Sequence, residues 1–292
     1  MLTYKLLLEE ANAKLINNDL AENAAQLLLL DALNIEPHQL YMMKEQNVDT
    51  DTLNKFETNL LRAMQDEPIQ HILGYQYFYG NRIKVNPNVL IPRGETEELV
   101  EQTINLYHRY FHEQENTYVC DMCTGSGAIA IALKKELPNL NIYASDISKE
   151  ALDVAHINAQ NNQTTLSFLK GDLLEPLIER NIKLDILVAN PPYIATNEEL
   201  TDSVIKYEPK LALYAGTQGL DIYEKLLLNI KKVINNKALI IMEIGYKQGK
   251  LIQELASKYF PTKEITIIKD LENKDRMVII KHNLENITDK LM

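Results

Sequence analysis

The chain has 292 residues, of which 46% are hydrophobic and 24% charged, and its formal net charge is −11. This length suits two domains and a large core, so folding requires neither a disulfide nor a metal. Binding to bare nucleic acid requires neutralisation of phosphates. The acidic balance and the lack of a marked Lys/Arg cluster in the sequence therefore predict no direct nucleic-acid partner.

The N-terminal stretch MLTYKLLLEEANAKL is charged and amphipathic, with Glu9 and Glu10 where a signal peptide needs an apolar core. The longest leucine run, residues 27–30, is too short to cross a bilayer. Cys120 and Cys123 suit a reducing compartment, and no second pair or histidine cluster completes a zinc site. We expect a cytoplasmic protein without a membrane partner or a metal.

Residues 1–74 are predicted to form a small helical bundle. Apolar residues recur at helical spacing in YKLLLEEANAKLI and in AAQLLLLDAL. Asp49 or Asp51 can cap a later helix, because a carboxylate accepts backbone N–H groups. Pro68 can open a short last helix that Gly74 closes.

Residues 75–92 are predicted to form a β-hairpin linker, because YQYFYGNRIKVN is aromatic and β-branched with a Gly-Asn turn in its middle. The next segment, IPRGETEELVEQTINLYHRYF, is predicted to be one helix, capped near Thr96, with acidic residues in its first turn. This helix begins a second domain, residues 93–283, and residues 284–292 are predicted to be a tail.

Strand-like and helical runs alternate from about residue 117 onward. The first five strand-like runs are residues 118–122, 141–146, 166–172, 184–190 and 238–244. Strands that alternate with helices imply a parallel sheet covered on both faces. The last two strand-like runs, 264–270 and 276–281, are joined by LENKD, which is too short for a crossover helix. The predicted fold class is α/β, a doubly wound, mostly parallel seven-stranded sheet with an antiparallel last strand.

The segment DMCTGSGAIAIALKKEL is predicted to form a strand, a tight turn and a helix. Gly125 and Gly127 remove side chains where the chain reverses and where a ligand approaches the backbone. The helix that begins near Ala128 directs its N–H groups into the same space. Asp146 ends the next strand, where a carboxylate can bind a ribose diol. This local pattern fits a dinucleotide and S-adenosylmethionine equally well.

Polar side chains end four successive strand-like runs: Asp121, Asp146, Asp172 and Asn190. In a parallel sheet the carboxyl ends of the strands meet at one edge, where ligands bind. An acidic rim suits a cationic sulfonium ligand and repels a pyrophosphate. The series therefore favours S-adenosylmethionine over a dinucleotide.

The run LDILVAN stops at Asn190, which is followed by Pro191, Pro192 and Tyr193. Each proline restricts the residue before it to an extended conformation, and neither proline has an N–H group. The corner therefore presents mostly acceptors, the Asn190 side-chain oxygen and the Pro191 carbonyl. Two such acceptors can bind both hydrogens of a planar NH2 group, and the Tyr193 ring can stack on its plane.

With its glycine turn, its acid after the second strand and its N-P-P-Y corner, the sequence resembles class I S-adenosylmethionine-dependent amino-methyltransferases. Across roughly residues 60–281 it resembles, more narrowly, the peptide chain release factor N5-glutamine methyltransferase family. The segments that carry this resemblance are PIQHILGYQYFYG, VLIPRGETEELV, NPPYIA, YEPKLALYAG, GLDIY and MEIG. Three positions depart from the family pattern: Cys123 replaces a glycine, Gly94 replaces a proline, and AGTQGLDIY lacks the usual G-G-x-D-G form.

The resemblance implies methyl transfer from S-adenosyl-L-methionine to the glutamine amide of the Gly-Gly-Gln motif in bacterial release factors. Asn190, Pro191 and Tyr193 would be catalytic and, with Pro192, would bind the substrate. The implied cofactor-binding residues are Asp121, Cys123, Thr124, Gly125, Ser126, Gly127, Asp146, Asp172, Leu173 and Asn190. We further expect a monomer whose N-terminal bundle binds the release factor and whose residues 194–220 form a substrate-contacting lid.

Three alternatives remain open at this point. A glutamine methylase of a ribosomal protein would use the same chemistry. A DNA or RNA adenine amino-methyltransferase would also suit N-P-P-Y, although it should carry a basic face that the sequence does not show. A non-enzymatic binding module would keep the fold and the glycine turn, but it would have no need of the two-acceptor corner.

Overall fold

The structure, a computed structural model, describes residues 2–16 and 23–284. These residues form two compact units. Unit 1 contains the described residues up to Tyr75 together with Leu200–Tyr207, and unit 2 contains Gln76–Glu199 and the described residues from Glu208 onward. Residues 200–207, which were predicted within the second domain, therefore group with the N-terminal unit. Residues 1 and 17–22 of the predicted bundle and 285–292 of the predicted tail lie outside the described residues.

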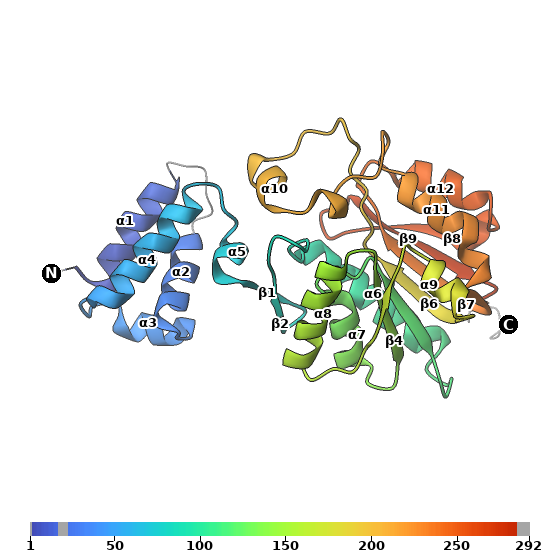
Figure 1. Ribbon diagram of the computed structural model, residues 1–292, viewed down its shortest axis with the longest axis horizontal. Helices are drawn as coiled ribbons and strands as arrows, with labels where there is room; N and C mark the ends of the chain where they lie inside the picture. The colour runs from blue at the N-terminus through green and yellow to red at the C-terminus, as the bar shows by residue number, and fades with distance from the viewer. Residues whose placement is uncertain (1, 17–22, 285–292) are drawn as a thin grey trace. The chain divides into compact units, whose positions relative to one another are not determined.

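Unit 1 is helical, as the sequence predicts (Figure 1). Its helices are α1 (Tyr4–Ile16), α2 (Ala24–Leu33), α3 (Pro37–Met43), α4 (Thr50–Ala63), α5 (Ile69–Leu73) and α10 (Asp202–Tyr207). The Asp49 side chain caps α4 by accepting a 2.9 Å hydrogen bond from the Thr52 N–H group. Pro68 precedes α5 and Gly74, with φ 78°, ends it. These three predicted helix boundaries are thereby confirmed.

The predicted hairpin is present, but its turn lies one residue earlier than expected. Strands β1 (Tyr75–Phe78) and β2 (Asn81–Lys84) are joined by Tyr79 and Gly80, which have φ 47° and φ 73°. A two-residue hairpin turn of this kind needs a positive φ at both central positions. Asn81 therefore begins β2 instead of sharing the turn, and its amide nitrogen donates back to the Tyr79 carbonyl at 2.9 Å.

Unit 2 is built on a seven-stranded sheet with the order β5-β4-β3-β6-β7-β9-β8. The strands are β3 (Tyr118–Met122), β4 (Asn141–Asp146), β5 (Ser167–Lys170), β6 (Leu184–Ala189), β7 (Ile234–Glu243), β8 (Ile265–Lys269) and β9 (Asp275–His282). Strands β3 to β7 pair in parallel, and β9 runs antiparallel to both β7 and β8. The predicted fold class is confirmed, although β7 begins four residues earlier than its apolar run.

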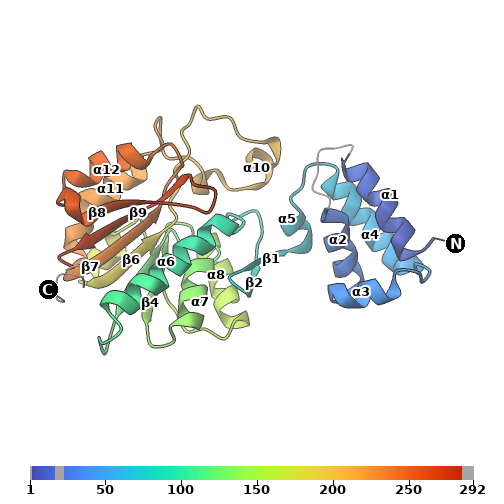
Figure 2. The ribbon, with the colours of Figure 1, turned by 180° about the vertical axis from the view of Figure 1, so that it is seen from behind.

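Helices cover both faces of this sheet (Figures 1 and 2). One face carries α6 (Gly94–Tyr110), α7 (Ala128–Glu136) and α8 (Lys149–Asn161), and the other carries α9 (Glu175–Glu179), α11 (Asp221–Asn229) and α12 (Gly249–Ser257). Along β6, Ile186 and Val188 belong to the core under α6 and α7, whereas Leu187 and Ala189 belong to the opposite core. Strand β6 is consequently buried at every position, as expected of a parallel strand between two layers.

The N-terminus of α6 differs from the prediction. The helix begins at Gly94 with Arg93 as its N-cap residue, whereas the sequence suggested a cap near Thr96. Thr96 is buried inside the first turn, and its hydroxyl donates to Glu243 Oε2 at 2.7 Å. Because this threonine makes a tertiary hydrogen bond, it does not cap its own helix. The predicted acidic residues of the first turn are present as Glu95 and Glu97.

A buried asparagine connects the hairpin to the glycine turn. Asn158 on α8 accepts from the Lys84 N–H group at 2.7 Å and donates to the Lys84 and Ser126 carbonyls, each at 2.9 Å. The side chain is fully buried, so no water competes for these backbone groups. Asn158 thus fixes the glycine turn against β2.

Replacing Asn158 with alanine is expected to lower the free energy of unfolding by about 1–3 kcal/mol, because buried backbone groups would lose their partners. Urea-induced unfolding measures the change. Asn161→Ala, at an exposed position of the same helix, is the matched control and should change stability by less than about 0.5 kcal/mol. Equal stability of the two variants would contradict this role for Asn158.

Candidate active site

A cavity of about 380 Å³ lies at the carboxyl edge of the sheet in unit 2. This volume is within the range of small-molecule sites. The predicted site residues that line it are Cys123, Thr124, Gly125, Ser126, Asp146, Asp172, Leu173, Asn190 and Pro192. Within the described part of the chain, the other predicted residues, Asp121, Gly127, Pro191 and Tyr193, lie outside the lining. The cavity thus brings together the glycine turn, the acidic strand ends and the N-P-P-Y corner.

The glycine turn depends on left-handed backbone conformations. Gly125 and Gly127 have φ 53° and φ 81°, and the Gly127 N–H group donates to the Thr124 carbonyl at 2.8 Å. A Cβ atom at Gly127 would lie 3.1 Å from that of Ala155, so the turn and α8 approach closely because no side chain intervenes. Cys123, at the position of a family glycine, also adopts a left-handed φ of 61°. The turn therefore accommodates this departure from the family pattern.

Asp121 lies beneath the turn, fully buried. Its Oδ2 atom accepts from the Thr124 hydroxyl at 2.5 Å and from the Ala130 N–H group at 3.2 Å. Burial raises the pKa of Asp121 to about 7, although the bonds from Thr124 and Ala130 act in the opposite direction. Asp121 supports the turn from below, and its direct contact with a cofactor stays a prediction.

Asp146 faces the cavity from the end of β4. Its Oδ2 atom accepts from the Gly125 N–H group and its Oδ1 atom from the Ser148 N–H group, both at 2.9 Å. Burial raises the pKa of this carboxyl, and the two N–H bonds partly counteract that effect. A carboxylate oxygen can accept more than one hydrogen bond. Asp146 is therefore held in place while both oxygens retain acceptor capacity for a ligand.

The N-P-P-Y corner begins directly after β6. Asn190 lines the cavity, and its amide nitrogen donates to the Thr96 hydroxyl oxygen at 3.1 Å. Pro191 is buried, and Pro192 lines the cavity. The Tyr193 ring packs against the core under α11 and α12, and its hydroxyl donates to Glu243 Oε1 at 3.3 Å. Stacking of this ring on a substrate amide stays a prediction.

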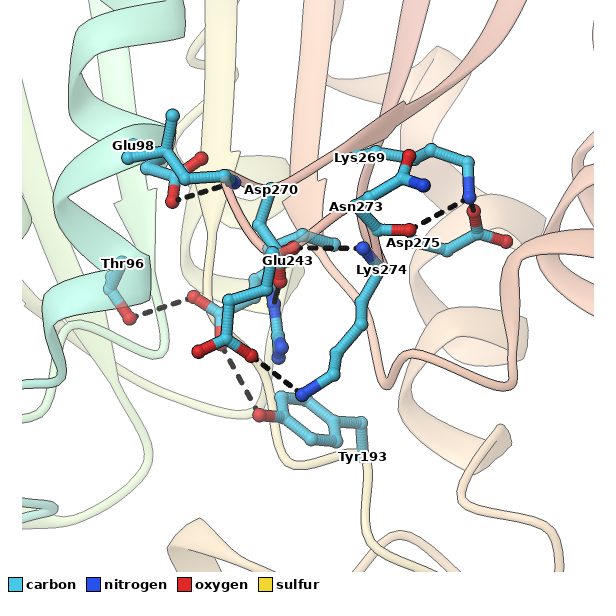
Figure 3. Close-up of polar contacts among 12 residues, drawn as sticks. Thr96, Glu98, Tyr193, Glu243, Lys269, Asp270, Asn273, Lys274 and Asp275 are labelled. Atoms are coloured by element: carbon cyan, nitrogen blue, oxygen red, sulfur yellow. Dashed lines mark hydrogen bonds and ion pairs between the residues drawn. The ribbon is translucent and has the colours of Figure 1, made fainter.

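Glu243, at the end of β7, was not identified from the sequence. Its buried carboxylate lies between Thr96 and Tyr193 (Figure 3). Burial raises its pKa to about 7, while the hydrogen bond from Thr96 lowers it. The segment MEIG could have identified it, because there an acidic residue ends a strand at the same edge of the sheet as Asp146.

Gln248 was also missed, because no motif marks it. Its Nε2 atom donates to the Tyr193 carbonyl at 2.9 Å and to the Gly219 carbonyl at 3.2 Å, and its Oε1 atom accepts from the Gly245 N–H group at 2.9 Å. This side chain joins the N-P-P-Y corner to the GLDIY segment. Such a role depends on contacts between distant segments and leaves no local pattern.

The segment 194–220 folds back on itself at its base. The Ile194 N–H group donates to the Leu213 carbonyl, and the Ala215 N–H group donates to the Ile194 carbonyl, each at 2.9 Å. Leu211 and Ala212 line the cavity from this segment. Leu211 and Ala212 therefore supply part of the cavity wall, and the action of residues 194–220 as a lid stays a prediction.

A buried carboxylate joins this wall to the start of α6. Glu208 accepts from the Ile91 N–H group at 3.1 Å and forms an ion pair with Arg93. Arg93 and Pro209, the residue after Glu208, both line the cavity. The VLIPRGETEELV and YEPKLALYAG segments thus meet at one side of the site.

Both cysteines are free thiols. Across residues 2–16 and 23–284, no three His, Cys, Asp or Glu side chains gather in a way that could hold a metal ion. No helix within these same residues has the length and apolarity that crossing a membrane requires.

Comparisons with known proteins agree with the geometry of both units. A family model described as the Methyltransferase small domain matches residues 97–212, and one described as the PrmC N-terminal domain matches residues 7–74. The chain is 40% identical over 259 residues to a release factor glutamine methyltransferase of Bacillus subtilis, covering 88% of this chain and 90% of that protein. A protein of the same name from Staphylococcus aureus is 38% identical over 283 residues, covering 96% of this chain and 100% of the relative.

Solved structures of low sequence identity share the fold. The hMettl16 catalytic domain in complex with a 3′UTR hairpin aligns with a TM-score of 0.53 at 15% identity, covering 79% of this chain and 83% of that one. A T. thermophilus 16S rRNA methyltransferase in complex with AdoMet and guanosine aligns with a TM-score of 0.50 at 13% identity. The alignment covers 72% of this chain and 50% of that one.

The strand order, the antiparallel last strand and the glycine turn define a class I methyltransferase. Within that class, the identities to proteins from many bacteria place the chain more narrowly. It belongs to the release factor glutamine methyltransferase family. The family and the enzyme class predicted from the sequence motifs are confirmed.

Gly219→Ala is expected to disturb the corner, because Gly219 has φ 69° and an added methyl group would overlap the Tyr193 carbonyl oxygen. Gly80→Ala is the matched control, since Gly80 has φ 73° but open space around its Cβ position. The left-handed conformation should cost each variant about 1–2 kcal/mol. The overlap should destabilise Gly219→Ala by about 1–3 kcal/mol more, measured by urea-induced unfolding. Equal losses in the two variants would contradict the predicted overlap.

Proposed function

We propose that the protein methylates the side-chain amide nitrogen of the glutamine in the Gly-Gly-Gln motif of bacterial peptide chain release factors, with S-adenosylmethionine as methyl donor. The observation that carries this proposal is the alignment with a release factor glutamine methyltransferase over 100% of that relative and 96% of this chain. The meeting of Asn190 and the glycine turn in one cavity supports it. The N-terminal unit, which matches the PrmC N-terminal domain at residues 7–74, is proposed to bind the release factor.

The volume of the cavity and the carboxylates of Asp146 and Asp172 in its lining support S-adenosylmethionine as the cofactor. The backbone of residues 123–127 would hold the methionine part, because its glycines leave room for a ligand against the main chain. Asp146 would accept from both ribose hydroxyls, and Asp172 and Leu173 would flank the adenine. The carboxylates at this edge favour the positive charge of the sulfonium. When bound, the cofactor supplies an electron-poor methyl group.

The corner at residues 190–193 would hold the substrate amide. An amide nitrogen is a poor nucleophile, because its lone pair is delocalised into the carbonyl. The Asn190 side-chain oxygen and the Pro191 carbonyl would accept its two N–H hydrogens and fix its position. As the nitrogen becomes more positive, its N–H groups become stronger donors, so both acceptors bind the transition state better than the ground state. The alkylated amide loses its proton readily, so no strong general base is required.

Asp146→Asn is expected to weaken binding of S-adenosylmethionine by about 10-fold or more, about 1.4 kcal/mol, because the amide replaces an acceptor by a donor and removes the charge. Isothermal titration calorimetry measures the Kd. Asp153→Asn removes an exposed carboxylate of α8 that pairs with Lys149, and it should leave the Kd unchanged. Normal affinity in Asp146→Asn would exclude the ribose contact.

Asn190→Ala is expected to raise the reaction barrier by about 2–4 kcal/mol, which lowers kcat by about 30-fold to 1000-fold, because one positioned acceptor is lost. Steady-state kinetics with a release factor and labelled S-adenosylmethionine test this. Asn141→Ala, at the exposed start of β4, serves as control. An Asn190→Ala enzyme with wild-type kcat would refute the proposed role.

The substrate class is tested by offering release factor, ribosomal proteins, DNA and RNA as competing acceptors of labelled methyl groups. We expect label on the release factor and its loss when the glutamine of the Gly-Gly-Gln motif is replaced by alanine. Label on a ribosomal protein or on nucleic acid instead would favour one of the alternative acceptors. Cofactor binding without any transfer would favour the non-enzymatic module.

A further inference from the structure

The amide of Asn190 can face the cavity in two ways that have the same shape. A half-turn of the side-chain amide exchanges its oxygen, an acceptor, with its NH2 group, a donor. Only the orientation with the oxygen toward the substrate can accept a substrate N–H group. Shape cannot distinguish the two orientations, so a directional hydrogen bond must do so.

Thr96 provides that direction. Its hydroxyl has one hydrogen, which it donates to Glu243 Oε2 at 2.7 Å. An ionised carboxylate only accepts hydrogen bonds, so it fixes the direction of this hydroxyl. The Thr96 oxygen is then left as an acceptor, and the Asn190 amide nitrogen donates to it at 3.1 Å. The Asn190 oxygen consequently occupies the opposite end of the amide.

Glu243 is itself held by several elements. The Tyr193 hydroxyl donates to its Oε1 atom at 3.3 Å, on the side of the carboxylate opposite Thr96 (Figure 3). The Tyr223 hydroxyl on α11 donates to its backbone carbonyl at 2.6 Å. Glu243 is 2% exposed, so water does not compete strongly for these bonds. In such a low-dielectric setting, the direction of one hydrogen bond constrains the next.

We propose that Glu243, acting through the Thr96 hydroxyl, selects the orientation of the Asn190 amide that presents its oxygen to the substrate. Glu243 and Thr96 are thus positioning residues for the reaction, and Asn190 remains the group that contacts the substrate. This inference rests on the proposed function, because it assumes that an N–H group of the substrate binds at Asn190.

The chain of hydrogen bonds from Asn190 through Thr96 to Glu243 is called the relay below. It depends on Glu243 accepting a hydrogen bond and not merely on the size of this side chain. A carboxamide or a protonated carboxyl at this position can donate to the Thr96 oxygen. The Thr96 hydroxyl can then donate to the Asn190 oxygen instead of to residue 243. The Asn190 NH2 group consequently turns toward the substrate. Two donors would then face each other, and the amide nitrogen would no longer be held for methyl transfer.

The relay should also respond to pH. The charged and titratable groups around the Glu243 carboxyl are Glu95 on α6, Tyr193, Tyr223 and Arg276 on β9. Burial raises the Glu243 pKa to about 7, against the effects of Thr96 and Arg276. Below that pH the carboxyl becomes protonated and can donate to Thr96. We therefore expect kcat to fall as the pH decreases through about 7.

Thr96→Val tests the relay, because valine keeps the shape and removes the hydroxyl. We expect kcat to fall by about 10-fold or more, with little change in cofactor Kd or in KM for the release factor. Thr96→Ser should restore most of the activity, because it returns the hydroxyl. Thr103→Val is the matched control, since Thr103 is a buried threonine of the same helix whose hydroxyl donates to the Leu99 carbonyl at 2.7 Å. That control should keep its kcat.

Glu243→Gln provides a second test that keeps the shape of the side chain. We expect kcat to fall about as much as in Thr96→Val. The kcat of Glu243→Gln should also no longer decrease as the pH drops below about 7. Because both residues act through one chain of bonds, the double variant should be no slower than the slower single variant. Multiplied effects in the double variant would contradict a shared relay.

The outcomes separate this inference from the proposed function. If the wild-type enzyme methylates the release factor while folded Thr96→Val and Glu243→Gln keep its kcat and its pH profile, the relay is refuted and the function stands. If the wild-type enzyme leaves the release factor unlabelled, the proposed function itself fails. A lower unfolding midpoint with unchanged kcat would assign both side chains to stability alone and would also overturn the relay.

Discussion

Parallel pairing of β3 with both β4 and β6 is the constraint on which the site depends. Met122, the last residue of β3, is in register with Ser145 on one side and Ala189 on the other. The next residues of the three strands are Cys123, Asp146 and Asn190, so they emerge side by side at one edge. Neighbouring strands lie about 4.8 Å apart, which places the turn, the acid and the corner within reach of one small ligand.

Two buried carboxyls support this edge of the sheet by accepting hydrogen bonds from threonines. Asp121 receives the Thr124 hydroxyl under the glycine turn, and Glu243 receives the Thr96 hydroxyl behind Asn190. In each case a threonine lies between the carboxyl and the ligand-facing part of the site. Burial raises the pKa of both carboxyls to about 7, so their protonation changes near neutrality. The direction of the hydrogen bonds around each carboxyl therefore depends on whether that carboxyl is ionised.

Local patterns explain what sequence reasoning predicted well. The strands of unit 2, the glycine turn and the N-P-P-Y corner follow from residue periodicity and from the backbone limits of glycine and proline. The predictions were wrong where a residue had two possible hydrogen-bonding partners. Thr96 is a good cap by composition, but it bonds Glu243, which is 147 residues away. The hairpin turn was placed one residue late because Asn81, a frequent turn residue, bonds back to Tyr79 from β2.

The sequence by itself determined the class of fold, the edge of the sheet at which the cavity lies, and the residues that reach that edge. These depend on strand direction and on backbone restrictions, which a few neighbouring residues impose. Only the tertiary structure decided which of those residues face the cavity and which support it from within. It alone revealed Glu243 and Gln248, because a side-chain hydrogen bond joins atoms that are adjacent in space however distant they are along the chain.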